Sequence, residues 1–365
     1  MCRALNSRIL EASSIVIFYL LLLYSIPGAL CPDNYSSLYS YDKDMPLNAV
    51  EALLTEGDKY LIYKVYFDSV NGERVPALLI LPKVEEKVPC IVFLHGYGGK
   101  KEDILPLTNL AASEGYALIA IDAEYHGERK EEGKALYSID IEDSVRGILQ
   151  TVIDLRRTID YVETRPEIDS SRIGYVGGSM GGILGAIFIG VEPRIKAAAL
   201  LVAGGNMSLM IRESQHPAIQ PIREYLQLNN ISYEELQETL NPIDPINFIG
   251  SFSPRPVVFH LGKYDRIVPA EAGEQLYKHA REPKTVYWYD SGHDLPLELV
   301  IARILDFMDM ELKDRRLAFY EMREFKYWLS RYALPLVTVI VVILFLVYTF
   351  RRKIIRSIQR TFKIL

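Results

Sequence analysis

The order of apolar and polar segments along the chain predicts an α/β fold. Two apolar stretches, 60–69 and 74–82, flank an Asn71-Gly72 pair, which is a strong signal for a β-hairpin. From residue 88 onward, short continuous apolar runs alternate with stretches of helical periodicity. Continuous apolar runs are typical of strands buried on both faces of a parallel sheet. We therefore expect a mixed, mostly parallel sheet with an N-terminal hairpin and helices on both faces.

The alternation extends to a last helix that starts near Pro296. Further strands are expected at 88–96, 116–123, 172–178, 195–204, 255–262 and 284–290, and further helices at 103–115, 140–162, from about Met180, and at 269–280. Residues 206–250 interrupt this rhythm with a polar stretch rich in Asn and Gln. This stretch predicts a small helical cap inserted into a domain that covers residues 32–313.

The N-terminal segment has the layout of a secretory leader. An unbroken apolar run at 15–24 continues to Leu30 and follows Arg3 and Arg8. A positively charged start followed by an apolar stretch is typical of a signal peptide. No small-residue cleavage site follows the run, so residues 1–31 are expected to be a signal peptide or an uncleaved signal anchor.

The C-terminal segment predicts a transmembrane helix. Residues 332–350 are nineteen residues without a charge, which is about the length that crosses a ~30 Å hydrocarbon core. A charged and aromatic stretch at 314–331 precedes them and is expected to be a helical juxtamembrane stalk. The tail at 351–365 holds six Lys/Arg residues and no acidic residue, which favours the cytoplasm. The domain between the two apolar segments is therefore expected at the cell membrane, outside the cytoplasm.

The net charge limits the classes of binding partner, and the number of cysteines limits the disulfide bonds that the chain can form. The whole chain carries a net charge of −6 and the tail +6, which leaves about −12 for the remainder (−6 minus 6). An acidic domain disfavours nucleic acid as a partner. Three cysteines do not form a disulfide framework, and Cys90 in an apolar strand is expected to be buried. The oligomeric state stays open.

The most informative short motif is Gly177-Gly178-Ser179-Met180-Gly181. It satisfies G-x-S-x-G and lies between an expected strand and an expected helix. Ser179 has two interpretations: it caps the helix, or it is a nucleophile held at a sharp turn. A nucleophile needs small flanking residues, and a helix that begins after it directs backbone N–H groups at a developing oxyanion.

A nucleophilic serine also needs a base and an acid that orients the base. Of six histidines, His293 is the best base, because it follows the last expected strand, where ligands bind in open α/β sheets. His126 follows a central strand and is a candidate for substrate contact. For the acid, Asp265 follows the preceding core strand and is favoured over Asp290 and Asp294, which are more simply turn residues. Of the other histidines, His95 is interpreted as shaping its loop, His260 as packed in the core and His279 as solvated. His216 has no assigned role.

With these residues assembled, the chain resembles the α/β-hydrolase superfamily over roughly residues 60–312. The matching pieces are "HGYGG", "GGSMGG", "GKYDRIVP" and "SGHD", in the chain order serine, aspartate, histidine. They look most like the branch of dienelactone hydrolases and prolyl-oligopeptidase-like serine esterases. The resemblance implies Ser179 as nucleophile, His293 as general base and acid, and Asp265 as its orienting acid. It also implies an oxyanion hole formed by the backbone N–H groups of Tyr97 and Met180.

The sequence therefore predicts a membrane-anchored, extracytoplasmic serine hydrolase of the carboxylesterase type. Its partners would be a small-molecule ester and, through the C-terminal helix, the lipid bilayer, with no metal or organic cofactor. Two alternatives stay open: a peptidase or amidase that uses the same residues, and a binding ectodomain that has the fold without the activity. The acyl and alcohol groups of the substrate are not indicated.

Overall fold

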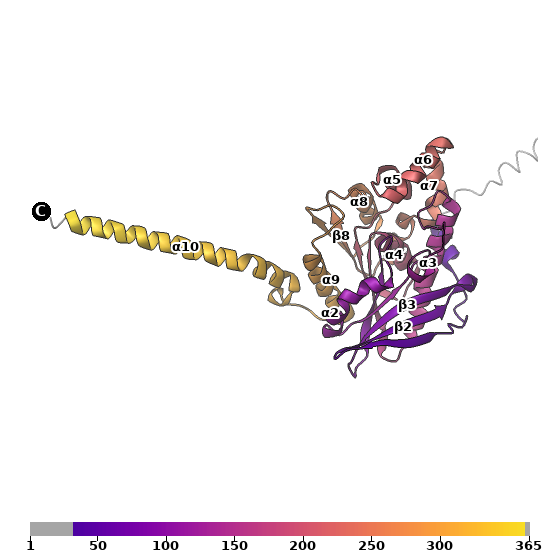
Figure 1. Ribbon diagram of the computed structural model, residues 1–365, viewed down its shortest axis with the longest axis horizontal. Coiled ribbons are helices and arrows are strands. Elements are labelled where there is room, and N and C mark those ends of the chain that lie inside the picture. The colour runs from indigo at the N-terminus through magenta and orange to yellow at the C-terminus, as the bar shows by residue number, and fades with distance from the viewer. Residues whose placement is uncertain (1–31, 362–365) are drawn as a thin grey trace, which may run out of the picture. The chain divides into compact units, whose positions relative to one another are not determined.

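The computed structural model describes residues 32–361, and the predicted leader at 1–31 lies outside them. The chain divides into two compact units, residues 1–40 and residues 41–365. In the first unit, the described part contains one 3₁₀ helix, η1 (Pro32–Tyr39). The second unit holds the sheet, the cap and the C-terminal helix, and its elements are drawn in Figure 1.

The second unit is built on a nine-stranded sheet with the order β1-β2-β3-β5-β4-β6-β7-β8-β9. The strands are β1 (Val50–Glu56), β2 (Tyr60–Asp68), β3 (Arg74–Pro82), β4 (Val88–Leu94), β5 (Ala117–Ile121), β6 (Ile168–Gly178), β7 (Ile195–Leu201), β8 (Val257–Gly262) and β9 (Lys284–Tyr289). The first three strands and the β3–β5 pair are antiparallel, whereas β4 to β9 are mutually parallel. The predicted hairpin and the mostly parallel sheet are confirmed.

Helices cover both faces of this sheet, as predicted. They are α2 (Thr108–Ser113), α3 (Ile141–Glu163), α4 (Met180–Val191), α8 (Ala270–His279) and α9 (Leu297–Leu312). Alternate residues of β7, Ala197 and Ala199, share a hydrophobic cluster with Met308 and Leu312 of α9. Because side chains alternate across a strand, the intervening residues face the opposite layer. Figure 1 shows α2 and α9 on one side of the sheet and α3 and α4 on the other.

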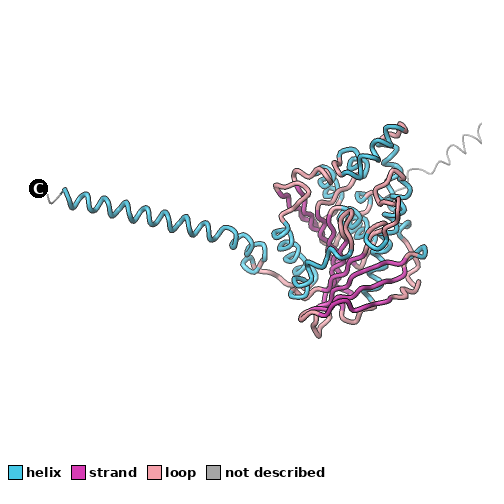
Figure 2. Tube along the Cα trace, viewed as in Figure 1, coloured by secondary structure: helices cyan, strands magenta, loops and turns pink. Residues whose placement is uncertain are grey.

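The inserted segment is helical, as its composition predicted. It contains α5 (Met207–Glu213), α6 (Gln220–Leu228) and α7 (Tyr233–Leu240), followed by short 3₁₀ turns up to Phe252. In α7 the hydroxyl of Ser232 accepts from the N–H of Glu235, and the Glu235 carboxylate accepts from the N–H of Ser232. This capping box starts a short helix in an otherwise polar stretch. Figure 2 shows the resulting group of helices beyond one end of the strands.

Two features differ from the sequence-based expectations. Strand β1 was not predicted, because all seven of its residues are exposed and its sequence lacks an alternating apolar pattern. The predicted helical stalk at 314–331 is only partly helical. Residues 314–318 are irregular, and the 3₁₀ turn η9 (Phe319–Glu321) comes before α10 (Arg323–Thr361). At the start of α10, the guanidinium of Arg323 pairs with Asp306 and Asp309 of α9 at 3.0 and 2.8 Å.

The apolar C-terminal segment lies within α10. Among the described residues, one helix is long and apolar enough to cross a membrane, over Arg323–Ile354. It includes residues 332–350 and continues into the basic tail without a break, and Pro335 lies inside it. By length and composition it is a candidate membrane span.

Candidate active site

Ser179 lies at a sharp turn between β6 and α4. Its backbone has φ +54° and ψ −120°, a conformation that a residue with a side chain adopts at a cost of about 1–3 kcal/mol. Its side chain makes no capping hydrogen bond to α4. The interpretation of Ser179 as a helix cap is therefore wrong. Its hydroxyl instead lies 3.0 Å from Nε2 of His293.

The glycines around Ser179 are required by close backbone approach. A Cβ at Gly177 would overlap the carbonyl oxygen of Gly181, and one at Gly181 would overlap the carbonyl oxygen of Leu94. The first turn of α4 therefore packs directly against the end of β4. This packing explains why the G-x-S-x-G spacing is needed here.

His293 connects Ser179 to a buried carboxylate. Its Nδ1 lies 2.8 Å from Oδ2 of Asp265, and its side chain is 25 % exposed, against 3 % for that of Asp265. The other oxygen of Asp265 accepts from the N–H groups of Ile267 and Val268 at 2.9 and 3.0 Å. The carboxylate is thus held in one orientation. Asp290 instead pairs with Lys263 at the surface, and Asp294 is exposed.

The backbone N–H groups of Tyr97 and Met180 are free to bind an anion. Met180 is the first residue of α4, and the first N–H groups of a helix have no acceptor inside the helix. Within the described part of the chain, the N–H of Tyr97 donates to no other residue. A Cβ at Gly96 would lie 3.7 Å from the Cβ of Ser179, which brings this loop next to the serine.

A buried polar network holds the loop that contains Tyr97. Asp122, at the end of β5, accepts from the N–H and the ammonium of Lys101 at 2.8 and 2.9 Å. The ring of His95 accepts from the N–H of Ala123 through Nε2 at 3.1 Å, and burial lowers the pKa of His95. His95 therefore shapes this loop, as the sequence suggested. The role of Asp122 was missed, because it depends on a residue 21 positions earlier in the chain.

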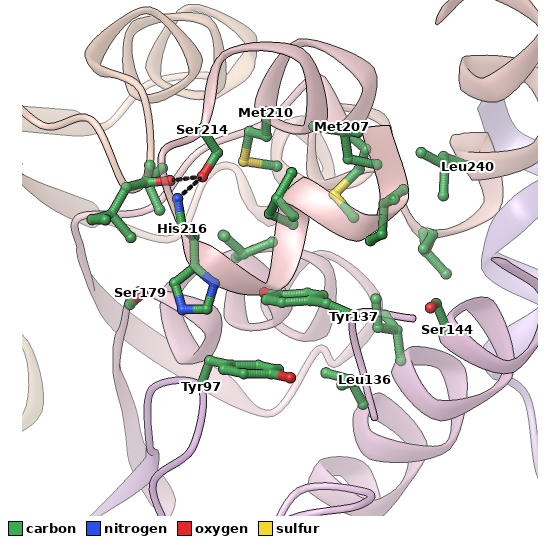
Figure 3. A pocket seen from close by; sticks show the side chains of 18 of the residues that line it. Tyr97, Leu136, Tyr137, Ser144, Ser179, Met207, Met210, Ser214, His216 and Leu240 are labelled. Atoms are coloured by element: carbon green, nitrogen blue, oxygen red, sulfur yellow. Dashed lines mark hydrogen bonds between the residues drawn. The ribbon is translucent and has the colours of Figure 1, made fainter. Parts of the chain in front are cut away.

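Ser179 opens onto an apolar cavity of about 70 Å³ under the cap (Figure 3). Its lining comes from the Tyr97 loop, the segment before α3, α3 itself, α4, the cap and the loop after β8. Figure 3 shows Tyr97 and Tyr137 along one wall and Met207 and Met210 along the opposite one. The two tyrosine rings are stacked, with centroids 4.8 Å apart. His293 is not among the lining residues.

Two histidines differ from their sequence-based interpretation. His126, the candidate for substrate contact, is 3 % exposed and is not among the residues that line the cavity. Its ring packs edge-to-face against Tyr97, and its Nδ1 contacts the carbonyl of Glu124.

His216, left unassigned, lines the cavity with its ring edge-to-face against Tyr97 (Figure 3). Its position depends on the folding of the cap, which the sequence did not reveal. Within residues 32–361 there is no group of three or more His, Cys, Asp or Glu side chains arranged to hold a metal ion.

Comparison with solved structures defines the class. An acetyl xylan esterase from Paenibacillus sp. R4 superposes with a TM-score of 0.65 at 24 % identity, covering 77 % of this chain and 93 % of that one. Acetyl xylan esterase 1 from Thermoanaerobacterium sp. JW/SL YS485 gives 0.68 at 21 % identity, with 78 % and 95 % covered. The fold is that of an α/β-hydrolase.

Sequence comparison then gives the family. The model of the acetyl xylan esterase family (AXE1) matches residues 36–309, so the chain belongs to this family. A putative esterase of Bacillus subtilis, YitV, is 25 % identical over 253 residues, which are 64 % of this chain and 96 % of that protein. A putative hydrolase of the same organism, YtaP, is 25 % identical over 252 residues, covering 64 % and 79 %. The protein is a serine hydrolase of the carboxylic ester hydrolase type.

Proposed function

We propose that this protein is a membrane-anchored carboxylesterase in which Ser179, His293 and Asp265 form the catalytic triad. The observation that carries the proposal is the continuous hydrogen-bond path from the Ser179 hydroxyl through both nitrogens of His293 to the buried Asp265 carboxylate. Ser179, at one end of this path, lines the apolar cavity. The arrangement provides a nucleophile, a base and an orienting acid in the geometry that acyl transfer requires.

The proposed reaction has two steps. In the first, Nε2 of His293 takes the proton of Ser179 while Oγ attacks the ester carbonyl carbon, and the carbonyl oxygen becomes an oxyanion that the N–H groups of Tyr97 and Met180 stabilise. His293 then gives its proton to the leaving alcohol, and the acyl group stays on Ser179. In the second step, His293 takes a proton from water, the hydroxide oxygen attacks the acyl carbon, and the carboxylic acid leaves as Oγ regains its proton.

Asp265 makes His293 a base of the required form. Its carboxylate accepts from Nδ1–H, which leaves Nε2 unprotonated and directed at Ser179. It also stabilises the imidazolium that forms when His293 holds the extra proton. The names of the structural neighbours make acetyl esters a reference substrate for assays.

The following experiment tests the esterase proposal. The purified full chain in detergent is assayed with p-nitrophenyl acetate and p-nitrophenyl butyrate, and in parallel with acyl-amino-acid p-nitroanilides. We expect ester turnover that Ser179→Ala abolishes, whereas Ser171→Ala, an exposed serine on the same strand, retains it. Faster turnover of the anilides than of the esters would favour the peptidase alternative. A folded wild-type chain that turns over neither class would refute the proposal.

We also propose that α10 spans the cell membrane and that the catalytic domain lies outside the cytoplasm. The exposed apolar side chains of residues 336–347 and the basic residues that follow support this arrangement. Protease added to intact cells should digest the domain and leave a C-terminal fragment that contains the tail. Protection of the domain in intact cells, together with digestion after lysis, would place it in the cytoplasm instead.

A further inference from the structure

The cavity next to Ser179 is built for an aliphatic group. Its walls are mainly side chains of Ile, Leu, Met and Val, and no Asp, Glu, Lys or Arg is among its lining residues. Several of the apolar residues come from the cap, including Met207, Ile222 and Leu240, each less than 9 % exposed. Burying a methylene group against such walls is favourable by about 0.8 kcal/mol, which is about fourfold in a binding constant.

Two polar side chains of the lining, those of Ser144 and Ser214, already form hydrogen bonds within the protein. The hydroxyl of Ser214 accepts from the N–H of His216 at 3.0 Å and donates to the carbonyl of Ile267 at 2.6 Å. The hydroxyl of Ser144 accepts from the N–H of Ser138 at 3.0 Å and contacts the carbonyl of Asp140 at 3.2 Å. Both serines are therefore occupied within the protein. A hydroxylated group placed among the aliphatic side chains would find few partners for its own donors and acceptors, which is costly.

The position of His293 assigns the cavity to the acyl side of the ester. His293 must reach the leaving oxygen to protonate it, so the alcohol lies on the side of Ser179 where His293 is. His293 is partly exposed and does not line the cavity, whereas Tyr97, an oxyanion donor, does. The alcohol is thus placed toward solvent, and the acyl chain toward the cavity.

The volume limits the length of that chain. A space of about 70 Å³ is several times the roughly 10–15 Å³ that one water occupies. A methylene group is close to a water in size, so the cavity has room for roughly five groups beyond the reacting carbonyl. An acetyl group has one carbon beyond its carbonyl and would leave most of this space unfilled.

We propose that this cavity binds the acyl chain of esters of roughly four to six carbons and makes them better substrates than acetyl esters. This inference rests on the proposed esterase function and names the substrate class of the same site. The alcohol part, held toward solvent, is less restricted. Specificity in such a pocket grows with each methylene until the cavity is full and falls beyond that length.

The test uses p-nitrophenyl esters of two, four, six, eight and twelve carbons with the full chain in detergent. Because the leaving group is the same throughout, differences in kcat/KM report acyl binding in the transition state. We expect kcat/KM to rise about tenfold or more from acetate to the best of the four- and six-carbon esters, and to fall for twelve carbons. A wild-type profile that is flat, or highest for acetate, would overturn the inference.

Leu240 allows the cavity to be made smaller and larger at one position. It is 2 % exposed at the end of α7, and Figure 3 shows it across the cavity from Ser179. We expect Leu240→Phe to lower the hexanoate-to-acetate ratio of kcat/KM about tenfold, and Leu240→Ala to move the best chain length up by about two carbons. The same changes at Leu228, an 82 % exposed leucine of α6 in the cap, should leave the profile as in the wild type.

The readout separates this inference from the proposed function and from loss of folding. A ratio of two substrates in one sample does not depend on the fraction of folded enzyme, and the wild-type profile decides even if a variant does not fold. If no ester of any length is turned over and Ser179 does not react with a fluorophosphonate, the esterase proposal fails. If esters are turned over but Leu240→Phe and Leu240→Ala leave the ratio unchanged, the acyl assignment of the cavity fails alone.

Discussion

Replacing Asp265 with asparagine should reduce kcat strongly while leaving the fold intact. The change keeps the shape of the side chain, and one oxygen of Asp265 already accepts from two backbone N–H groups, those of Ile267 and Val268. The amide oxygen of the introduced asparagine can keep both bonds only if its NH₂ group points at His293. Nδ1 of His293 must then act as an acceptor, which puts the proton on Nε2, toward Ser179. In this tautomer His293 cannot accept the serine proton.

The structure also gives the size of the effect. The variant regains the active tautomer of His293 if the side-chain amide of the asparagine flips by 180°. This flip leaves the two backbone N–H groups facing an NH₂ donor. Each buried donor without an acceptor costs about 1–3 kcal/mol, so the turned state lies roughly 2–6 kcal/mol higher. With about 1.36 kcal/mol for each factor of ten in rate, kcat should fall roughly 30- to 26 000-fold.

The assay is kcat for p-nitrophenyl butyrate at neutral pH, with the melting temperature as a check on folding. The matched control is Asp290→Asn, a second aspartate near His293 in sequence that lies at the surface and pairs with Lys263 at 2.7 Å. We expect the control to remain within about twofold of the wild type. If Asp265→Asn stays within fivefold, or if the control loses as much activity, the assignment of Asp265 as the orienting acid is refuted.

Three further changes test the structure around the site. Gly181→Ala should lower the free energy of unfolding by about 1–3 kcal/mol and reduce fluorophosphonate labelling of Ser179, because the added Cβ overlaps the Leu94 carbonyl oxygen. An unchanged urea-unfolding curve would contradict this close approach. Asp122→Ala should lower the free energy of unfolding by about 3–5 kcal/mol, since it leaves the Lys101 ammonium buried without its most buried partner. A loss below about 1 kcal/mol in urea unfolding would argue against the network. His260 is fully buried, and burial, reinforced by a nearby arginine, lowers its pKa to about 3. The unfolded chain therefore binds a proton near pH 6.5 that the folded chain does not, so stability should decrease by about 2 kcal/mol from pH 7 to pH 5 through this group. His260→Phe should remove that part of the pH dependence of urea unfolding, and an unchanged pH dependence would contradict it.

The sheet and the residues proposed to form the triad were predictable because each leaves a local signal. Continuous apolar runs marked the parallel strands, and G-x-S-x-G between a strand and a helix marked Ser179. Asp265 and His293 each follow a strand, and the carboxyl ends of parallel strands meet at one edge of the sheet. The proximity of Ser179, Asp265 and His293 could therefore be inferred from their positions just after strands.

Groups whose position depends on packing between distant segments could not be inferred in this way. His216 reaches the cavity only because the cap folds over Tyr97, which lies more than a hundred residues earlier. Asp122 gained its role from a contact with Lys101, which lies 21 positions earlier in the chain. His126 has the same kind of sequence position as the site residues, yet the ring of Tyr97 packs against it, and it does not line the cavity.

The most direct test of the central claim is to locate the nucleophile by covalent labelling. The full wild-type chain in detergent is treated with a fluorophosphonate, digested, and analysed by mass spectrometry for the modified residue. We predict one phosphonylated serine, Ser179, with labelling lost in Ser179→Ala and retained in Ser171→Ala. Folded wild-type protein that remains unlabelled, or that is labelled at another serine, would contradict the claim that Ser179 is the nucleophile of this enzyme.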